Sequence, residues 1–382
     1  SQASAAAPSE GPRYFVKTVN PFWQKSLGVR HVFENGFTTD LSGIQAALAR
    51  LFGLEIEPVL QLHISPVSVE ETIEPKGRGK TLRPLPSDQT PWGIQVIYND
   101  SSITASSGGL GVNVAVLDTG VLKTHNDLKN RIKQCKDFTQ SKTPLKDGVC
   151  GDLNGHGTHV SGIILADAGA DKLGIYGIAP EANLLSYKVC GSDGGCWADD
   201  VAFALRVAAD NSADIINLSL GSDTESQLIR DAVNYAVSKD VLVAAAAGND
   251  GPYPLSIDYP AAQAEVLAVG AVDISISVPD WSSRGDNFNT LPYSIQEKDM
   301  EFGAPGVGVE SAWKNGGYAV LSGTSMSSPH AAGLAAKLWP APETVLEGFR
   351  AQTTRDLLHQ LAKDIWTLGD DDATGFGLPQ VK

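Results

Sequence analysis

The chain has 382 residues, of which 42% are hydrophobic and 19% are charged, a balance typical of globular rather than disordered proteins. This length exceeds what one ordinary core needs, so we expect a large domain accompanied by a smaller one. The longest apolar run, 241–247, is too short to cross a membrane, and the net charge of −15 has the wrong sign for a general nucleic-acid binder. We therefore expect neither a membrane nor a nucleic-acid partner.

The first 87 residues differ from the rest in charge, with 9 basic and 8 acidic residues against 20 and 36 in residues 88–382. Residues 14–19 and 29–33 are patterned as strands, 44–52 have helical spacing, and 54–64 alternate again. Residues 1–64 are therefore predicted to form a small α+β domain. The Pro-, Gly- and Lys-rich residues 65–87 are predicted to be a linker.

From residue 88 onward, short apolar segments alternate with helical ones. Strands are predicted at 112–117, 182–189, 215–220, 241–247 and 266–272, with helices at 156–166, 199–211 and 225–239. Buried strands that alternate with helices indicate an α/β domain, a parallel sheet with helices on both faces. Chemistry in such sheets takes place at the carboxyl ends of the strands.

Polar residues stand at these strand ends and at helix starts. Asp118 ends one strand, Asn249 follows another, and His156 and Ser325 each open a helix within a Gly-rich segment. The order Asp, His, Ser is one of the three chain orders of a serine-hydrolase triad. Ser325 lies in Gly-x-Ser-x-Ser rather than Gly-x-Ser-x-Gly, which argues against an esterase of the α/β-hydrolase type. The i,i+3 spacing of His156 and His159 does not fit a metal-binding helix, so His159 is predicted to be a packing residue.

With these four motifs, residues 88–382 resemble the subtilisin family of serine proteases. The resemblance implies a serine endopeptidase that cleaves polypeptides through an acyl-enzyme. Ser325 would be the nucleophile, His156 the general base and Asp118 the residue that orients the imidazole. Asn249 and the Ser325 N–H would bind the oxyanion. The alternative is a catalytically silent scaffold, which labelling with a serine-directed fluorophosphonate would distinguish.

The resemblance also places the substrate. The substrate backbone would pair with two segments of the enzyme. The substrate side chains would contact the rim of one binding pocket and the wall of another. These positions are Ser219, Leu220 and Gly221 with Asp193, Gly194 and Gly195 for pairing, Trp197 for the rim of the fourth pocket, and Ala246, Ala247 and Gly248 for a wall of the first. Such small walls admit a large side chain. Specificity for basic residues would require clustered carboxylates, which the sequence neither demands nor excludes.

A structural Ca²⁺ ion is implied by the same resemblance. The ligands would be the carboxylates of Asp88, Asp127 and Asp171 and the backbone carbonyls of Leu173 and Ile175. Hard oxygen donors of this kind suit Ca²⁺. The alternative is that these acids are simply solvated.

Residues 13–64 resemble the family's propeptide, a ferredoxin-like unit that assists folding and inhibits the enzyme in the same chain until it is cleaved off. The processing bond is expected within 62–88, and the alternative is a permanent accessory domain. The resemblance suggests a secreted, monomeric enzyme made as a self-processing zymogen. The insertion 286–303 suggests no function.

The four cysteines form two close pairs, Cys135 with Cys150 and Cys190 with Cys196. Four cysteines allow three pairings, and proximity favours the local one. Neither pair has the Cys-x-x-Cys spacing of a zinc site. Two disulfides would indicate an oxidising compartment, whereas four reduced thiols remain the alternative.

Overall fold

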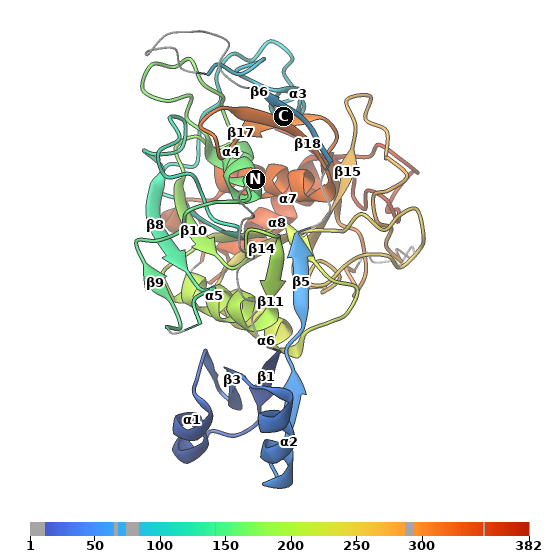
Figure 1. Cartoon of the computed structure of the whole chain (residues 1–382). Helices are drawn as coiled ribbons and strands as arrows, with labels where there is room; N and C mark the ends of the chain where they lie inside the picture. Colours follow the sequence, from blue (N-terminus) through green and yellow to red (C-terminus); the bar gives the residue numbers. More distant parts are fainter. Residues whose placement is uncertain are drawn as a thin grey trace.

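The computed structural model describes residues 12–64, 68–73, 84–141, 143–286, 294–346 and 348–381. A small N-terminal unit lies against one side of a much larger α/β unit (Figure 1). The small unit contains β1 (Arg13–Val16), α1 (Pro21–Leu27), β2 (Val32–Phe33), β3 (Gly36–Asp40), α2 (Gly43–Leu51) and β4 (Ile56–Pro58). Its antiparallel sheet has the order β2-β3-β1-β4, the ferredoxin-like arrangement that was predicted.

Local chemistry explains why α2 begins where it does. The Ser42 side chain accepts a hydrogen bond from the Gln45 N–H, and the Gln45 side chain accepts one from the Ser42 N–H. This capping box satisfies two backbone donors that the first turn of a helix leaves free. The helix then buries Ala46 and Ala49 against the sheet, where Val16 and Phe37 form the centre of a small separate core.

The large unit is built on an eight-stranded sheet in the order β16-β15-β14-β12-β7-β10-β8-β9. All neighbours pair in parallel except β8 and β9 at one edge, which are antiparallel. The strands are β7 (Asn113–Asp118), β8 (Ile132–Asp137), β9 (Lys146–Asp147), β10 (Asn183–Lys188), β12 (Ile215–Leu218), β14 (Leu242–Ala246), β15 (Val266–Val272) and β16 (Phe302–Pro305). The predicted parallel sheet is confirmed.

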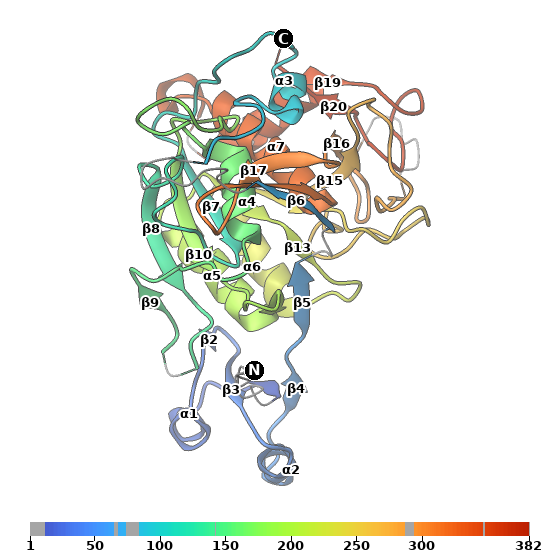
Figure 2. The same ribbon diagram turned by 45° about the horizontal axis from the view of Figure 1, so that its top comes forward.

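Helices cover both faces of this sheet because its strands are apolar on both sides. In β7, Val114 and Val116 belong to the core beneath α4 (His156–Leu165) and α7 (Thr324–Leu338). Ala115 and Leu117 belong to the opposite core, beneath α5 (Ala198–Asp210) and α6 (Gln227–Ser238). Helices α5 and α6 lie on the side that faces the small unit (Figure 2).

Further elements of the large unit lie outside this sheet or at its ends. They are α3 (Trp92–Ile97), β17 (Val309–Ala312), β18 (Tyr318–Ser322), the 3-10 helix η1 (Pro342–Thr344), α8 (Arg350–Leu361), β19 (Ala362–Lys363) and β20 (Leu378–Pro379).

Disulfides join Cys135 to Cys150 and Cys190 to Cys196, which confirms the local pairing. No helix among the residues described combines the length and apolarity needed to cross a membrane.

Two stretches differ from the prediction. The alternating segment 54–64 is not one strand, because β4 stays with the small unit while β5 (Gln61–Ile64) joins strands of the large one. Within the predicted linker, β6 (Ser68–Ile73) pairs antiparallel with β18. Composition does not reveal that a segment pairs with a remote strand. Because the residues around β6 are rich in Pro and Gly, the whole stretch was predicted to be a linker. The remaining linker residues 65–67 and 74–83 and the insertion residues 287–293 lie outside the described residues.

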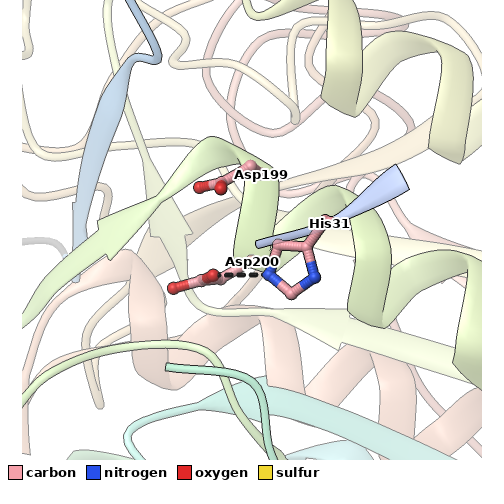
Figure 3. A group of neighbouring side chains, drawn as sticks. All are labelled: His31, Asp199 and Asp200. Atoms are coloured by element: carbon pink, nitrogen blue, oxygen red, sulfur yellow. Dashed lines mark hydrogen bonds and ion pairs between the residues drawn. The ribbon is translucent and has the colours of Figure 1, made fainter. Parts of the chain in front are cut away.

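The two units meet at a buried cluster of charged side chains (Figure 3). Arg13 Nη1 lies 2.9 Å from Asp199 Oδ1 and 2.8 Å from Asp200 Oδ2, in the first turn of α5. His31 Nε2 lies 2.8 Å from Asp200 Oδ1, and its ring stacks on Phe203. Acidic groups at a helix N-terminus are favoured by the helix dipole, but buried carboxylates also need partners. Here the small unit supplies them.

Candidate active site

The predicted acid and base meet where β7 ends and α4 begins. His156 Nδ1 lies 2.9 Å from Asp118 Oδ1 and 3.0 Å from Asp118 Oδ2, with both side chains buried. Asp118 Oδ1 also accepts the Thr119 N–H. The carboxylate therefore holds a proton on Nδ1 and leaves Nε2 as the basic nitrogen. Gly157 permits this approach, because a side chain there would place its Cβ 2.3 Å from the Gly120 carbonyl oxygen.

Ser325 is held in the first turn of α7 by the segment that joins β12 to β13 (Leu220–Gly221). Its Oγ donates to the Ser219 carbonyl at 3.1 Å, and the Ser219 Oγ donates to the Ser325 carbonyl at 2.8 Å. His156 Nε2 is buried and has no hydrogen-bond partner among the described residues. Contacts between nucleophile and base often form only in the substrate complex, so this geometry is compatible with Ser325 and His156 acting as such a pair.

Asn249 follows β14 and has a fixed orientation. Its Oδ1 accepts hydrogen bonds from the Thr324 backbone N–H and from Thr324 Oγ1, both at 3.0 Å. Thr324 Oγ1 in turn accepts the Gly248 N–H at 3.1 Å. Because the amide oxygen is held by Thr324, the Asn249 Nδ2 group points the other way as a donor. Thr324 is thus a positioning residue, and its place beside Ser325 was the only signal for it in the sequence.

The predicted substrate-pairing segments are brought together, and the chain's own β5 lies between them. β5 pairs antiparallel with β11 (Gly195–Trp197) on one side and with β13 on the other. His63 is opposite both Gly195 and Gly221, Leu62 is opposite Cys196, and the Ile64 N–H donates to the Gly194 carbonyl at 3.0 Å. These are the contacts of an extended peptide added to two sheet edges.

Residues of the predicted subsites lie beside β5 or follow β14. Trp197 flanks this strand opposite Gln61, and the Arg13 guanidinium lies 4.8 Å from the centre of its ring. Asp193 Oδ1 accepts the Gly195 N–H, and the Cys190–Cys196 disulfide closes the same loop. The predicted wall residues Ala246, Ala247 and Gly248 end at the Asn249 position, with the two alanines fully buried.

Part of the predicted calcium set converges. Asp127 is fully buried, and its Oδ2 accepts the Ile175 N–H at 3.0 Å and the Tyr318 hydroxyl at 2.7 Å. Asp171 Oδ1 accepts the Leu173 N–H at 3.3 Å, within the loop that follows α4. Tyr318, which sequence reasoning missed, fixes the Asp127 carboxylate from a strand far along the chain.

Asp88 makes local contacts: its Oδ1 accepts the Thr90 N–H at 3.0 Å and its Oδ2 accepts an N–H of the Gln95 side chain at 3.2 Å. The neighbouring Gln89 reaches the loop that follows α4, and its side-chain amide donates to the carbonyls of Lys172 at 2.7 Å and Gly174 at 3.1 Å. Asp88 as a ligand stays a prediction, and Gln89 is a side chain near this loop that the prediction did not include.

His159 is a buried packing residue, as expected. Its Nε2 lies 3.0 Å from the Val309 carbonyl and 3.1 Å from the Ala319 carbonyl, so it donates a proton to them. Burial, reinforced by the nearby His156, lowers the pKa of His159 to about 3. A neutral imidazole that donates through Nε2 contributes packing and hydrogen bonding rather than metal binding.

The sequence model described as the Subtilase family (Peptidase_S8) matches residues 109–377. The chain is 45% identical to "Subtilisin" from Bacillus sp. (strain TA39), over 98% of this chain and 93% of that protein. This chain belongs to the subtilase family. It is also 37% identical to "M-protease" from Shouchella clausii (strain KSM-K16), over 75% of this chain and 70% of the relative.

Solved structures agree with this assignment. The subtilase resembles the "S41 Psychrophilic Protease" with a TM-score of 0.73 and 48% identity, over 78% of this chain and 99% of that one. "Sphericase" gives the same TM-score at 46% identity and the same coverage. This subtilase is therefore a serine endopeptidase with the subtilisin-like α/β fold, and its substrates are polypeptides.

Proposed function

We propose that this chain is the self-inhibited precursor of a secreted serine endopeptidase, in which Asp118, His156 and Ser325 form the catalytic triad. The observation that carries the proposal is the position of β5, which lies between the two segments expected to bind substrate. Ile64 at its carboxyl end is opposite Leu220, which follows Ser219, the residue whose carbonyl accepts the Ser325 hydroxyl. The small unit, here called the prodomain, would then be an intramolecular inhibitor.

The chemistry follows from the residues at the site. His156 Nε2 removes the proton of the Ser325 hydroxyl as its oxygen attacks the scissile carbonyl, and later returns that proton to the leaving amine. Asp118 stabilises the imidazolium through Nδ1–H. The Asn249 Nδ2 group and the Ser325 N–H at the start of α7 stabilise the negative charge on the carbonyl oxygen, because both donors are in place before that charge develops. Water then releases the acyl group by the same route.

The pairing of β5 narrows the expected processing region. Since β5 lies between the two segments expected to bind substrate, we expect the bond after Ile64, in the part of the interval 62–88 that follows β5. After cleavage, β5 and the prodomain are held only by non-covalent contacts and can dissociate. A permanent accessory domain predicts instead that no bond in this region is cut.

Processing is tested with the wild-type chain and Ser325→Ala, each purified with Ca²⁺ and followed by gel electrophoresis and mass spectrometry. We expect the wild type to cut itself after residue 64 and then to hydrolyse casein, while Ser325→Ala stays whole. Casein cleavage by an uncut wild type would leave the endopeptidase but remove the inhibitory role of the prodomain. If fluorophosphonate failed to label Ser325 in the wild type after removal of the prodomain, the triad itself would be rejected.

The loop after α4 is proposed to bind Ca²⁺. Its donors are all oxygens, from the carboxylates of Asp127 and Asp171 and the carbonyls of Leu173 and Ile175, which suits this ion. Gln89 could join them by turning its amide so that Oε1 rather than Nε2 faces the loop. The ion would lock the loop against Asp127. We expect chelation to lower the melting temperature of Ser325→Ala, with Asp127→Asn abolishing the response.

Secretion and a monomeric state complete the proposal. The two disulfides support an oxidising compartment. The monomeric state is supported by the triad, the substrate cleft and the inhibitory strand, which all come from one chain. Sedimentation of Ser325→Ala as a single 40.2 kDa species would agree with this proposal, whereas a stable dimer would contradict it.

A further inference from the structure

A carboxylate lies between the two glycines that border the predicted first substrate pocket. A Cβ added to Gly221 would lie 2.8 Å from Asp258 Oδ2, and one added to Gly248 would lie 2.7 Å from the same atom. The Asp258 N–H donates to the Ala247 carbonyl at 2.9 Å, which fixes the residue beside the wall. Both glycines therefore leave space that this carboxylate occupies, next to Asn249.

Asp258 does not stand alone. The carboxylates of Asp223, Asp250 and Asp258 each place an oxygen within 4.8 Å of the others. Asp258 is only 7% exposed, and its Oδ1 has no hydrogen-bond partner among the described residues. Lys298 belongs to the surroundings, but its Nζ donates to the Leu255 carbonyl.

Such a cluster is costly unless a cation completes it. Burial raises the pKa of Asp258 to about 8, and the neighbouring carboxylates of Asp250 and Asp223 add to the effect. Without a partner, Asp258 therefore favours its protonated form at neutral pH. A positive group that enters the cluster would displace this proton and satisfy the free Oδ1 at once.

We propose that Asp258, with Asp223 and Asp250, forms the floor of the pocket for the residue before the cleaved bond, and that the pocket selects Lys or Arg. This inference rests on the active site proposed above. The carbonyl of that substrate residue must lie beside Ser325 and Asn249, so its side chain enters between the segments 219–221 and 246–248. Their small residues admit a long aliphatic stem, whose charged end then reaches the carboxylates.

An apolar side chain fits this floor poorly. It would leave the buried Asp258 carboxylate without a partner, and buried polar groups without partners are strongly unfavourable. A carboxylate at the base of this pocket is also how other serine proteases select basic residues. The clustered carboxylates that basic specificity would require, and that the sequence did not locate, are thus supplied by the fold.

The test uses self-processed wild-type enzyme, Asp258→Asn and the control Asp231→Asn, which removes one exposed negative charge from α6. Active sites are counted with a fluorophosphonate, and kcat/KM is measured on succinyl-Ala-Ala-Pro-X-aminomethylcoumarin peptides with X as Lys, Arg, Phe or Leu. We expect wild type and Asp231→Asn to prefer Lys and Arg. In Asp258→Asn the Lys-to-Phe ratio should fall about tenfold or more, mainly through KM.

An unchanged Lys-to-Phe ratio in Asp258→Asn, or a wild type that prefers Phe and Leu, would overturn the proposal. Should Asp258→Asn fail to fold, the wild-type cleavage sites in denatured casein decide the matter, because enrichment of Lys and Arg before the cut supports the proposal and its absence refutes it. Competition by added Ca²⁺ without any preference for Lys or Arg would identify a metal site instead. Failure of fluorophosphonate labelling would refute the active site, whereas a labelled enzyme without the preference refutes only this inference.

Discussion

The buried contact between prodomain and catalytic unit gives a prediction with a definite size. Arg13 is 1% exposed and lies between the carboxylates of Asp199 and Asp200, which are fully buried. The substitution Arg13→Met keeps the aliphatic stem but removes the charge, so both carboxylates lose the guanidinium that lies within 3 Å of each. Breaking one side of a buried ion pair costs about 3–5 kcal/mol. Since about 1.4 kcal/mol is a factor of ten, detachment of the prodomain should become about 10²–10⁴-fold more favourable.

The assay is native-state hydrogen exchange of β1 and β3 in full-length Ser325→Ala, where no self-cleavage interferes. Amides in these strands should exchange faster in the Arg13→Met variant by the same factor, because they open when the prodomain detaches. Lys17→Met is the matched control, since Lys17 pairs with Glu55 and Glu57 on the exposed face of the prodomain and should change little. Equal exchange in Arg13→Met and Lys17→Met would refute the reasoning.

Three further predictions concern the catalytic unit. Thr324→Val removes a neutral hydrogen bond to Asn249, which is worth about 0.5–1.5 kcal/mol. We therefore expect kcat to fall about 2- to 13-fold while KM changes little. An unchanged kcat would show that Thr324 does not position the amide. Replacing Cys135 and Cys150 by Ala in Ser325→Ala should lower the free energy of unfolding in urea by about 3 kcal/mol, and an equal midpoint would contradict this. The pKa of His159 is about 3 in the folded state and near 6.5 in the unfolded state, so between these pH values only the unfolded state binds the proton. The free energy of unfolding should therefore fall as the pH drops below 6.5, by up to about 1.4 kcal/mol per pH unit. The variant His159→Gln should flatten that slope when urea melts are measured over a series of pH values.

The sequence alone determined the features that depend on local pattern. Asp118, His156, Ser325 and Asn249 were predicted as reacting groups because each stands in a short Gly-rich or apolar segment whose type is read from neighbouring residues. The parallel sheet was predicted from apolar runs such as 215–220. A strand that is buried on both faces carries apolar side chains at successive positions instead of alternating with polar ones. The disulfides followed from proximity, since Cys190 and Cys196 are six residues apart.

Tertiary structure decided everything that depends on which remote side chains meet. Arg13 and Asp199 are 186 residues apart, and no sequence pattern around either residue predicts that the two side chains meet. The alternation of 54–64 does not reveal that β5 leaves the prodomain sheet for the substrate cleft. Asp258 looks like an ordinary acid before Tyr259, and it becomes a pocket residue only because the chain folds it against two glycines. Local pattern specifies the elements and the reacting groups, whereas the inhibition and the selectivity proposed for this subtilase arise from contacts that exist only after folding.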